Sequence, residues 1–226
     1  MNTLFEKEIK LSRVIISIVL LAAGFYMLEK VYSPVSFLGL FLAGIIGVVI
    51  TFGFDGLKKI FSKPNKGSAK VILISIIVSY VLSISLAIFA NTVLNQPTSA
   101  NPIKDAFTGS IANSLSVLFK TIFMLIGEEL FVTLPLVIIV IFLVKKAKLS
   151  QSRAVIIATV ITAILFGAIH LPTYQWNVFQ CFVIIGLTRI PFTIATLKTN
   201  SMVSGVIAHI IYDWCIFIYI IIEQLK

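Results

Sequence analysis

The sequence Ile126-Gly127-Glu128-Glu129-Leu130-Phe131 places two adjacent carboxylates inside a long apolar run. Between residues 116 and 144 the only other ionisable side chain is Lys120, near one end of that run. A charged side chain at the centre of a bilayer costs about 2.5–3.5 kcal/mol on insertion scales. Two acids in such a segment therefore need partners from other apolar segments, and those partners should define a site.

The composition predicts an all-α, polytopic membrane protein. Of its 226 residues, 59% are hydrophobic and 12% are charged, and the mean hydropathy is +1.08. These values exclude an ordinary soluble domain and favour one integral-membrane domain, a helical bundle over residues 1–226. The net charge of +9 comes from basic clusters between apolar runs, so it indicates membrane orientation and not binding to nucleic acid. We expect contacts with membrane lipid, and the sequence fixes no oligomeric state.

Seven apolar runs predict seven transmembrane helices, with eight as an alternative count. The runs cover about residues 12–28, 35–54, 71–94, 114–144, 154–169, 176–197 and 202–222. We expect residues 1–112 to supply packing helices and residues 113–226 to form a catalytic core bundle. Residues 1–10 are expected to lie as a polar tail on the membrane surface, and residues 95–113 to form a polar loop with a short surface helix.

Turn-forming residues and the lengths of the apolar runs predict where the helices end or bend. We expect a turn at Ser33-Pro34, an end of the second run at Asp55-Gly56, and an interruption of the sixth run at Arg189 and Pro191. The fourth run exceeds the roughly 20 residues that a bilayer needs. It is therefore expected to tilt, to kink near Pro135 or to extend beyond the membrane.

The distribution of basic residues predicts a cytoplasmic N-terminus and an outer C-terminus. The predicted inner side holds Lys7, Lys10, Arg13, Lys58, Lys59, Lys63, Lys66, Lys70, Lys145, Lys146, Lys148, Arg153 and Lys198. The outer side keeps Lys30, Lys104 and Lys226. The Lys- and Ile-rich, Cys-poor composition is typical of a low-GC bacterium, so the predicted location is a bacterial cytoplasmic membrane.

Partners for the acid pair are few, because the chain has only two histidines. His170 ends the fifth run, and His209 lies in the seventh run one helical turn before Asp213, so the last two share a helix face. Together these residues could form a buried site that activates water, with one glutamate as base and its neighbour held by hydrogen bonds. The alternatives are a protonated acid pair that only satisfies polar atoms in the bundle, and a merely interfacial His170.

Glu-Glu in the fourth run, Phe166-x-x-x-His170 and His209-x-x-x-Asp213 resemble, in this order, the three motifs of the CPBP family. This family comprises CAAX prenyl proteases and bacteriocin-processing or immunity membrane proteins, and it is also called Abi. The resemblance covers about residues 119–217. It implies that Glu128 activates water for attack on a peptide bond and that His170 assists. It also implies that His209 and Asp213 stabilise the oxyanion, although an ionised Asp213 would instead orient His209.

The sequence departs from the family at Thr133, where the pattern Glu-Glu-x-x-x-Arg has an arginine. Glu129 therefore lacks its expected cation. We hypothesise that Arg189 on the sixth run supplies this charge, with Phe166 as a further supporting residue.

The leading interpretation is a glutamate-dependent endopeptidase acting on a membrane-associated peptide or protein, such as a bacteriocin or pheromone, or in self-immunity. A non-catalytic scaffold or immunity protein of the same family is the alternative, and a proton-coupled transporter is a third reading. A zinc ion held by Glu128, His170 and His209 stays open, as does a metal-free mechanism, because the chain has no H-E-x-x-H motif.

Overall fold

The computed structural model describes residues 1–30, 35–107 and 109–224. Its long helices are α1 (Leu11–Lys30), α2 (Ser36–Ile60), α3 (Ser68–Thr92), α4 (Ile111–Lys145), α5 (Gln151–Ile169), α6 (Gly186–Thr199) and α7 (Met202–Gln224). Two 3₁₀ helices, η1 (Asn2–Leu4) and η2 (Pro102–Phe107), and a π-helix, η3 (Phe179–Ile185), complete the described part, in which no strand occurs. The predicted Ser33-Pro34 turn and the predicted outer Lys226 lie outside the described residues.

The all-α membrane fold is confirmed, and so is the number of spans. Seven helical segments of the described chain are long and apolar enough to cross a membrane, with η3 and α6 together forming the sixth. The protein is therefore a multi-pass membrane protein. The short helix expected in the polar loop is present as η2.

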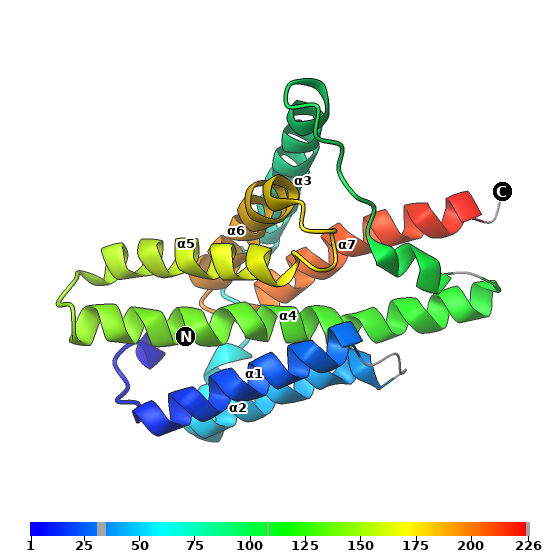
Figure 1. Ribbon diagram of the computed structural model, residues 1–226. Coiled ribbons are helices and arrows are strands. Elements are labelled where there is room, and N and C mark those ends of the chain that lie inside the picture. The colour runs from blue at the N-terminus through cyan, green and yellow to red at the C-terminus, as the bar shows by residue number, and fades with distance from the viewer. Residues whose placement is uncertain (31–34, 108, 225–226) are drawn as a thin grey trace.

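Helix α4 is the centre of the bundle (Figure 1). The pair α1 and α2 packs on one side of it, and α5 and α7 pack on the other. Helix α6 lies against α5 and α7, and α3 covers α6 and α7 from outside at a steep angle to α4. Most of α4 is accordingly buried, whereas α3 is mostly exposed.

The length of α4 follows from its central position. Its 35 residues span roughly 52 Å at 1.5 Å per residue, against about 30 Å for the hydrocarbon core. The helix continues through Pro135, so tilt or extension beyond the membrane accommodates the excess.

Gly127 lets the middle of α4 touch the backbone of α2. A Cβ atom at this position would lie 2.7 Å from the Phe41 nitrogen and 3.0 Å from the Leu40 carbonyl carbon. The residue directly before the acid pair thus sets how closely the α1–α2 pair approaches the site.

Two of the predicted breaks are wrong. Arg189 and Pro191 lie within α6, and the irregular part of the sixth span is instead the π-helix that precedes it. The second span does not end at Asp55-Gly56 either. Its helical path breaks at Gly53, which adopts φ +74°, and then continues to Ile60.

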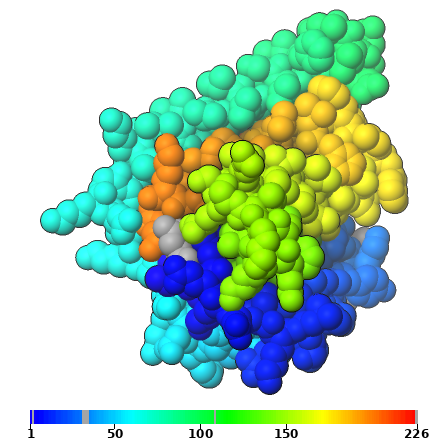
Figure 2. Space-filling view, turned by 90° about the vertical axis from the view of Figure 1, so that its left-hand side faces the viewer, coloured from blue at the N-terminus to red at the C-terminus, as the bar shows by residue number. Residues whose placement is uncertain are grey.

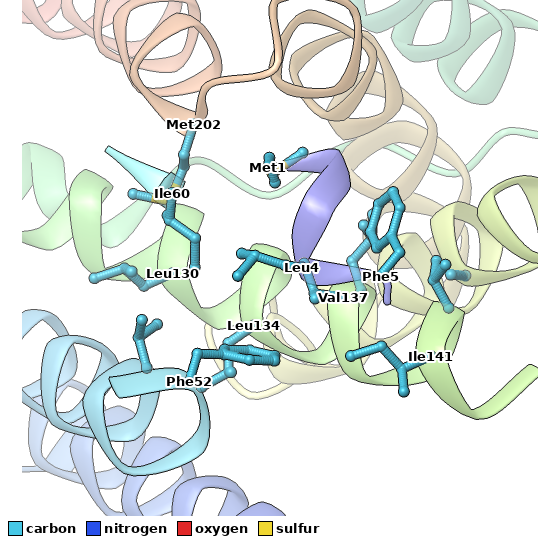
Figure 3. Packing of buried hydrophobic residues seen from close by; sticks show 14 of the residues in the cluster. Met1, Leu4, Phe5, Phe52, Ile60, Leu130, Leu134, Val137, Ile141 and Met202 are labelled. Carbon is cyan, nitrogen blue, oxygen red and sulfur yellow. The ribbon is translucent and has the colours of Figure 1, made fainter. Parts of the chain in front are cut away.

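The prediction of a surface tail over residues 1–10 is also wrong, at least for its first half. Met1, Leu4 and Phe5 are buried, and they pack between α2, α4 and the start of α7 (Figure 3). Their neighbours include Phe52, Leu134 and Val137. The average polarity of the segment concealed an apolar face, because positions 1, 4 and 5 fall on the same side of a helical turn.

The buried N-terminal face should contribute measurably to stability. Leu4 is fully buried, so Leu4→Ala should lower the free energy of unfolding by about 2–5 kcal/mol through lost contacts and a residual cavity. Thermal unfolding of the purified protein in detergent measures this change. Leu11→Ala, at a position 73% exposed, is the matched control. Equal melting temperatures for the two variants would contradict the packing of residues 1–5.

Candidate active site

Helix α4 directs its two glutamates to different surroundings. Successive helical residues point about 100° apart, and both side chains are largely removed from solvent, with 11% of Glu128 and none of Glu129 exposed. Glu129 faces α6 and α7, whereas Glu128 lines a cavity. The two acids are therefore not equivalent.

Glu129 is held by a cation from α6. The Arg189 guanidinium donates to both carboxylate oxygens: Nη2 lies 3.0 Å from Oε2, and Nη1 makes a shorter contact with Oε1. This bidentate pair is the contact hypothesised for Arg189 in place of an arginine at Thr133, which is itself buried on α4. Such forked geometry makes two parallel charge-assisted hydrogen bonds.

Aromatic rings enclose the Arg189 guanidinium. Its central carbon lies 4.9 Å from the centre of the Phe166 ring and 5.9 Å from that of Phe192. The negative faces of aromatic rings attract a cation, most strongly where water is excluded. Phe166, predicted as a supporting residue, thus contacts the cation.

His209 on α7 is surrounded by three carboxylates. Its Nδ1 lies 2.9 Å from Glu129 Oε1, and its Nε2 lies 3.4 Å from Asp213 Oδ2 and 3.8 Å from Glu128 Oε2. Phe192 stacks on the imidazole, with ring centres 5.0 Å apart. The predicted pairing of His209 with Asp213 across one helical turn is therefore present.

The close approach of α4 to α7 depends on Gly205, one turn before His209. A Cβ atom there would lie 2.9 Å from Glu129 Oε2 and 3.0 Å from the Phe192 carbonyl oxygen. Any larger residue would collide first with the Thr196 hydroxyl and also with the carboxylate that binds Arg189 and His209.

His170 follows directly after α5, and its tautomer is defined by one hydrogen bond. Its Nδ1 lies 2.7 Å from the Phe166 carbonyl oxygen. Because a carbonyl oxygen only accepts, Nδ1 carries the hydrogen and the neutral ring keeps a lone pair on Nε2. The ring lines the same cavity as Glu128.

In the sequence, His170 ends one apolar run whereas Glu128 lies in the middle of another. The placement of α5 brings the two residues to the same level. This helix begins at Gln151, earlier than predicted, and it ends beside the middle of α4 (Figure 1). The end of α5 therefore lies level with the acid pair.

Two adjoining cavities meet at this level. The inner one, of about 180 Å³, is lined by Glu128, His170, Arg189, His209 and Asp213 together with aromatic and aliphatic side chains. The outer one has a volume of about 670 Å³. Both are lined by Asn101, Met124, Glu128, His170 and Tyr174, so Glu128 and His170 lie where the two spaces join.

Two residues of the site, Tyr174 and Phe192, were not predicted from the sequence. Tyr174 is buried, lines both cavities and stacks with His170 at 6.1 Å between ring centres. Burial raises the pKa of the Tyr174 hydroxyl, which therefore stays protonated near neutral pH and can donate a hydrogen bond. Its position four residues after His170 was an available signal, whereas nothing in the sequence distinguished Phe192 from other apolar residues.

The described residues do not fit the zinc site that the sequence left open. Nowhere in residues 1–30, 35–107 and 109–224 does a group of three or more His, Cys, Asp or Glu side chains have an arrangement able to hold a metal ion. Glu128, His170 and His209 therefore do not form a ligand set of this kind.

The fold and the site define a class: a helical membrane protein with glutamates and histidines from three helices at a buried cavity. Residues 110–215 match the family model described as "Type II CAAX prenyl endopeptidase Rce1-like". This part of the chain therefore matches the CPBP family of membrane proteases, and the resemblance found in the sequence is confirmed. No curated protein and no solved structure matches the chain.

Loss of the Arg189 cation should destabilise the bundle. Arg189→Met leaves the Glu129 carboxylate buried without its cation, which should cost about 3–5 kcal/mol of unfolding free energy. Thermal unfolding in detergent should show a lower melting temperature, and Glu129→Gln in the same chain should recover part of the loss. Arg153→Met, at an exposed position, is the control. An Arg189→Met protein as stable as the parent would show that the ion pair does not support the fold.

Proposed function

We propose that the protein is an intramembrane endopeptidase that uses Glu128 as general base. The observation that carries this proposal is that the two glutamates have different contacts. Glu129 is bound by Arg189 and His209, while Glu128 shares a cavity wall with His170. A carboxylate that lines a cavity, and whose two oxygens are not both bound by a guanidinium, can accept a proton from water.

The proposed reaction begins with a water molecule between Glu128 and His170. Glu128 takes a proton as the water oxygen attacks the peptide carbonyl carbon, and the Nε2 lone pair of His170 orients the same water. Glu128 then delivers the proton to the leaving amine as the carbon–nitrogen bond breaks. Proton transfer of this kind contributes typically about 10²–10⁴-fold to a rate.

Hydrogen-bond donors on the opposite wall would bind the developing oxyanion. In its protonated form His209 donates through Nδ1 to Glu129 and presents Nε2–H to the cavity. Asp213, 3.4 Å from Nε2, would hold the imidazole in position and not bind the oxyanion, since a carboxylate would repel it. The Tyr174 hydroxyl is a second donor at this cavity. Fixed donors in a site with little water are effective because they need not reorganise.

The substrate that we propose is a membrane-associated peptide or protein, with maturation of a bacteriocin or pheromone, or self-immunity, as its setting. The proposed location is a bacterial cytoplasmic membrane with the N-terminus in the cytoplasm. This orientation is supported by the basic residues that the positive-inside rule assigns to the cytoplasm.

Thr133 favours a non-catalytic scaffold, because it stands where the family pattern has an arginine. The ion pair between Arg189 and Glu129 supplies a cation at that carboxylate from another helix. Since the main argument for loss of activity is thereby weakened, the endopeptidase is the better supported function.

Hydrolysis of fluorescence-quenched membrane peptides by the purified protein in liposomes tests the proposal. Glu128→Gln and His170→Ala should each reduce turnover by about 10²–10⁴-fold, the usual contribution of a general base. Glu6→Gln, at an exposed position in the N-terminal segment, should retain full turnover. A chelator should leave turnover unchanged, because the described residues offer no metal-ligand group.

Intact folding of each variant is checked by its elution from a sizing column and its melting temperature. If Glu128→Gln cleaves as fast as the parent, the glutamate mechanism is wrong. If the parent binds peptides without cleaving any, and Glu128→Gln binds equally well, the scaffold alternative is correct.

A further inference from the structure

The outer cavity leads from the site toward one particular end of the bundle. Apart from the residues shared with the inner cavity, its wall comes from the end of α1, the start of α2, η2, Lys120 in the first half of α4 and the segment after α5. Glu29, Lys30, Ser36 and Thr173 are among its polar residues, and the Thr173 hydroxyl donates to Glu29 at 3.0 Å. All these elements lie on the right-hand side of Figure 1.

Toward the opposite end the bundle is filled with apolar side chains. From Leu130 onward, α4 packs through Leu134, Val137 and Ile141 against α2, the first residues of the chain and Met202 (Figure 3). Interiors packed in this way contain few voids larger than a water molecule. A peptide approaching from this end would meet the packed core before reaching Glu128.

The packed end is also the basic end. Figure 2 looks onto it and shows the N-terminal segment, the turn between α2 and α3, the turn between α4 and α5 and the end of α6 together on one face. These segments carry the basic residues for which the positive-inside rule predicts a cytoplasmic location. Near the cavity mouth, Lys30, Lys104 and Lys120 are accompanied by Glu29 and Asp105, so little net charge remains there.

We infer that the site opens to the outer face of the membrane and that its substrates are peptide segments exposed there, after or during export. The positive-inside rule places the basic end in the cytoplasm, and the cavity opens at the other end. That the segments entering the cavity are substrates rests on the proposed function. The route from the outer face to Glu128 is a property of the fold alone. Segments that remain in the cytoplasm would not reach Glu128.

Cysteine labelling in intact spheroplasts tests the orientation without any need for catalysis. In a chain with Cys181→Ala and Cys215→Ala, Ala100→Cys near the cavity mouth is compared with Ala147→Cys at the basic end. Both alanines are exposed. A membrane-impermeant maleimide should label Ala100→Cys directly and Ala147→Cys only after the membrane is opened. Thr98→Cys and Ser152→Cys, also exposed, form a second pair in case a variant of the first pair does not fold.

The route is tested by a cysteine inside the cavity wall. Met124→Cys lines both cavities, whereas Val140→Cys lies on the same helix in the packed core. A small charged methanethiosulfonate added outside should modify Met124→Cys and leave Val140→Cys unmodified. Labelling of Ala147→Cys but not Ala100→Cys, labelling of both, or modification of Met124→Cys only from the cytoplasmic side would overturn the inference. If the protein cleaved no peptide, so that the endopeptidase proposal failed, these labelling results would still be expected.

Discussion

The buried contact between Glu129, Arg189 and His209 is the interaction on which the rest of the structure depends. One carboxylate, one guanidinium and one imidazole from α4, α6 and α7 meet where almost no solvent reaches. None of these groups could stay charged there alone, because removing an ion from water costs several kcal/mol. The contact therefore fixes the mutual positions of three helices, and it leaves Glu128 directed to the cavity.

Small residues make that contact possible. Gly205 admits the Glu129 carboxylate beside α7, and Gly127 admits the backbone of α2 beside α4. Without a strong hydrophobic force between helices in lipid, close packing at such residues is a main source of association. The polar site and the tight helix contacts thus depend on each other, since each requires the helices to approach closely.

Much of this arrangement was predictable because charge is costly in an apolar segment. Glu128, His170 and the pair His209 and Asp213 lie in three different apolar runs, which predicted their meeting. The missing arginine at Thr133 indicated Arg189 as a partner for Glu129. The buried face of residues 1–5 and the contribution of Tyr174 were not predictable in this way. Both depend on how distant segments pack, and local composition holds little information on tertiary contacts.

The π-helix before α6 has a consequence for the direction in which Arg189 points. A π-helical turn takes up more residues than an α-helical turn, and each residue advances an α-helix by about 100°. One extra residue is therefore accommodated within the stretch Phe179–Ile185 without a full rotation of α6 by about 100°, so that Arg189 still points to Glu129. Adding or removing one residue between Gly186 and Arg189, which are α-helical, would instead turn the guanidinium by about 100°, away from the carboxylate. Changes of chain length should accordingly be tolerated better in the loops and in the π-helix than in this short α-helical stretch.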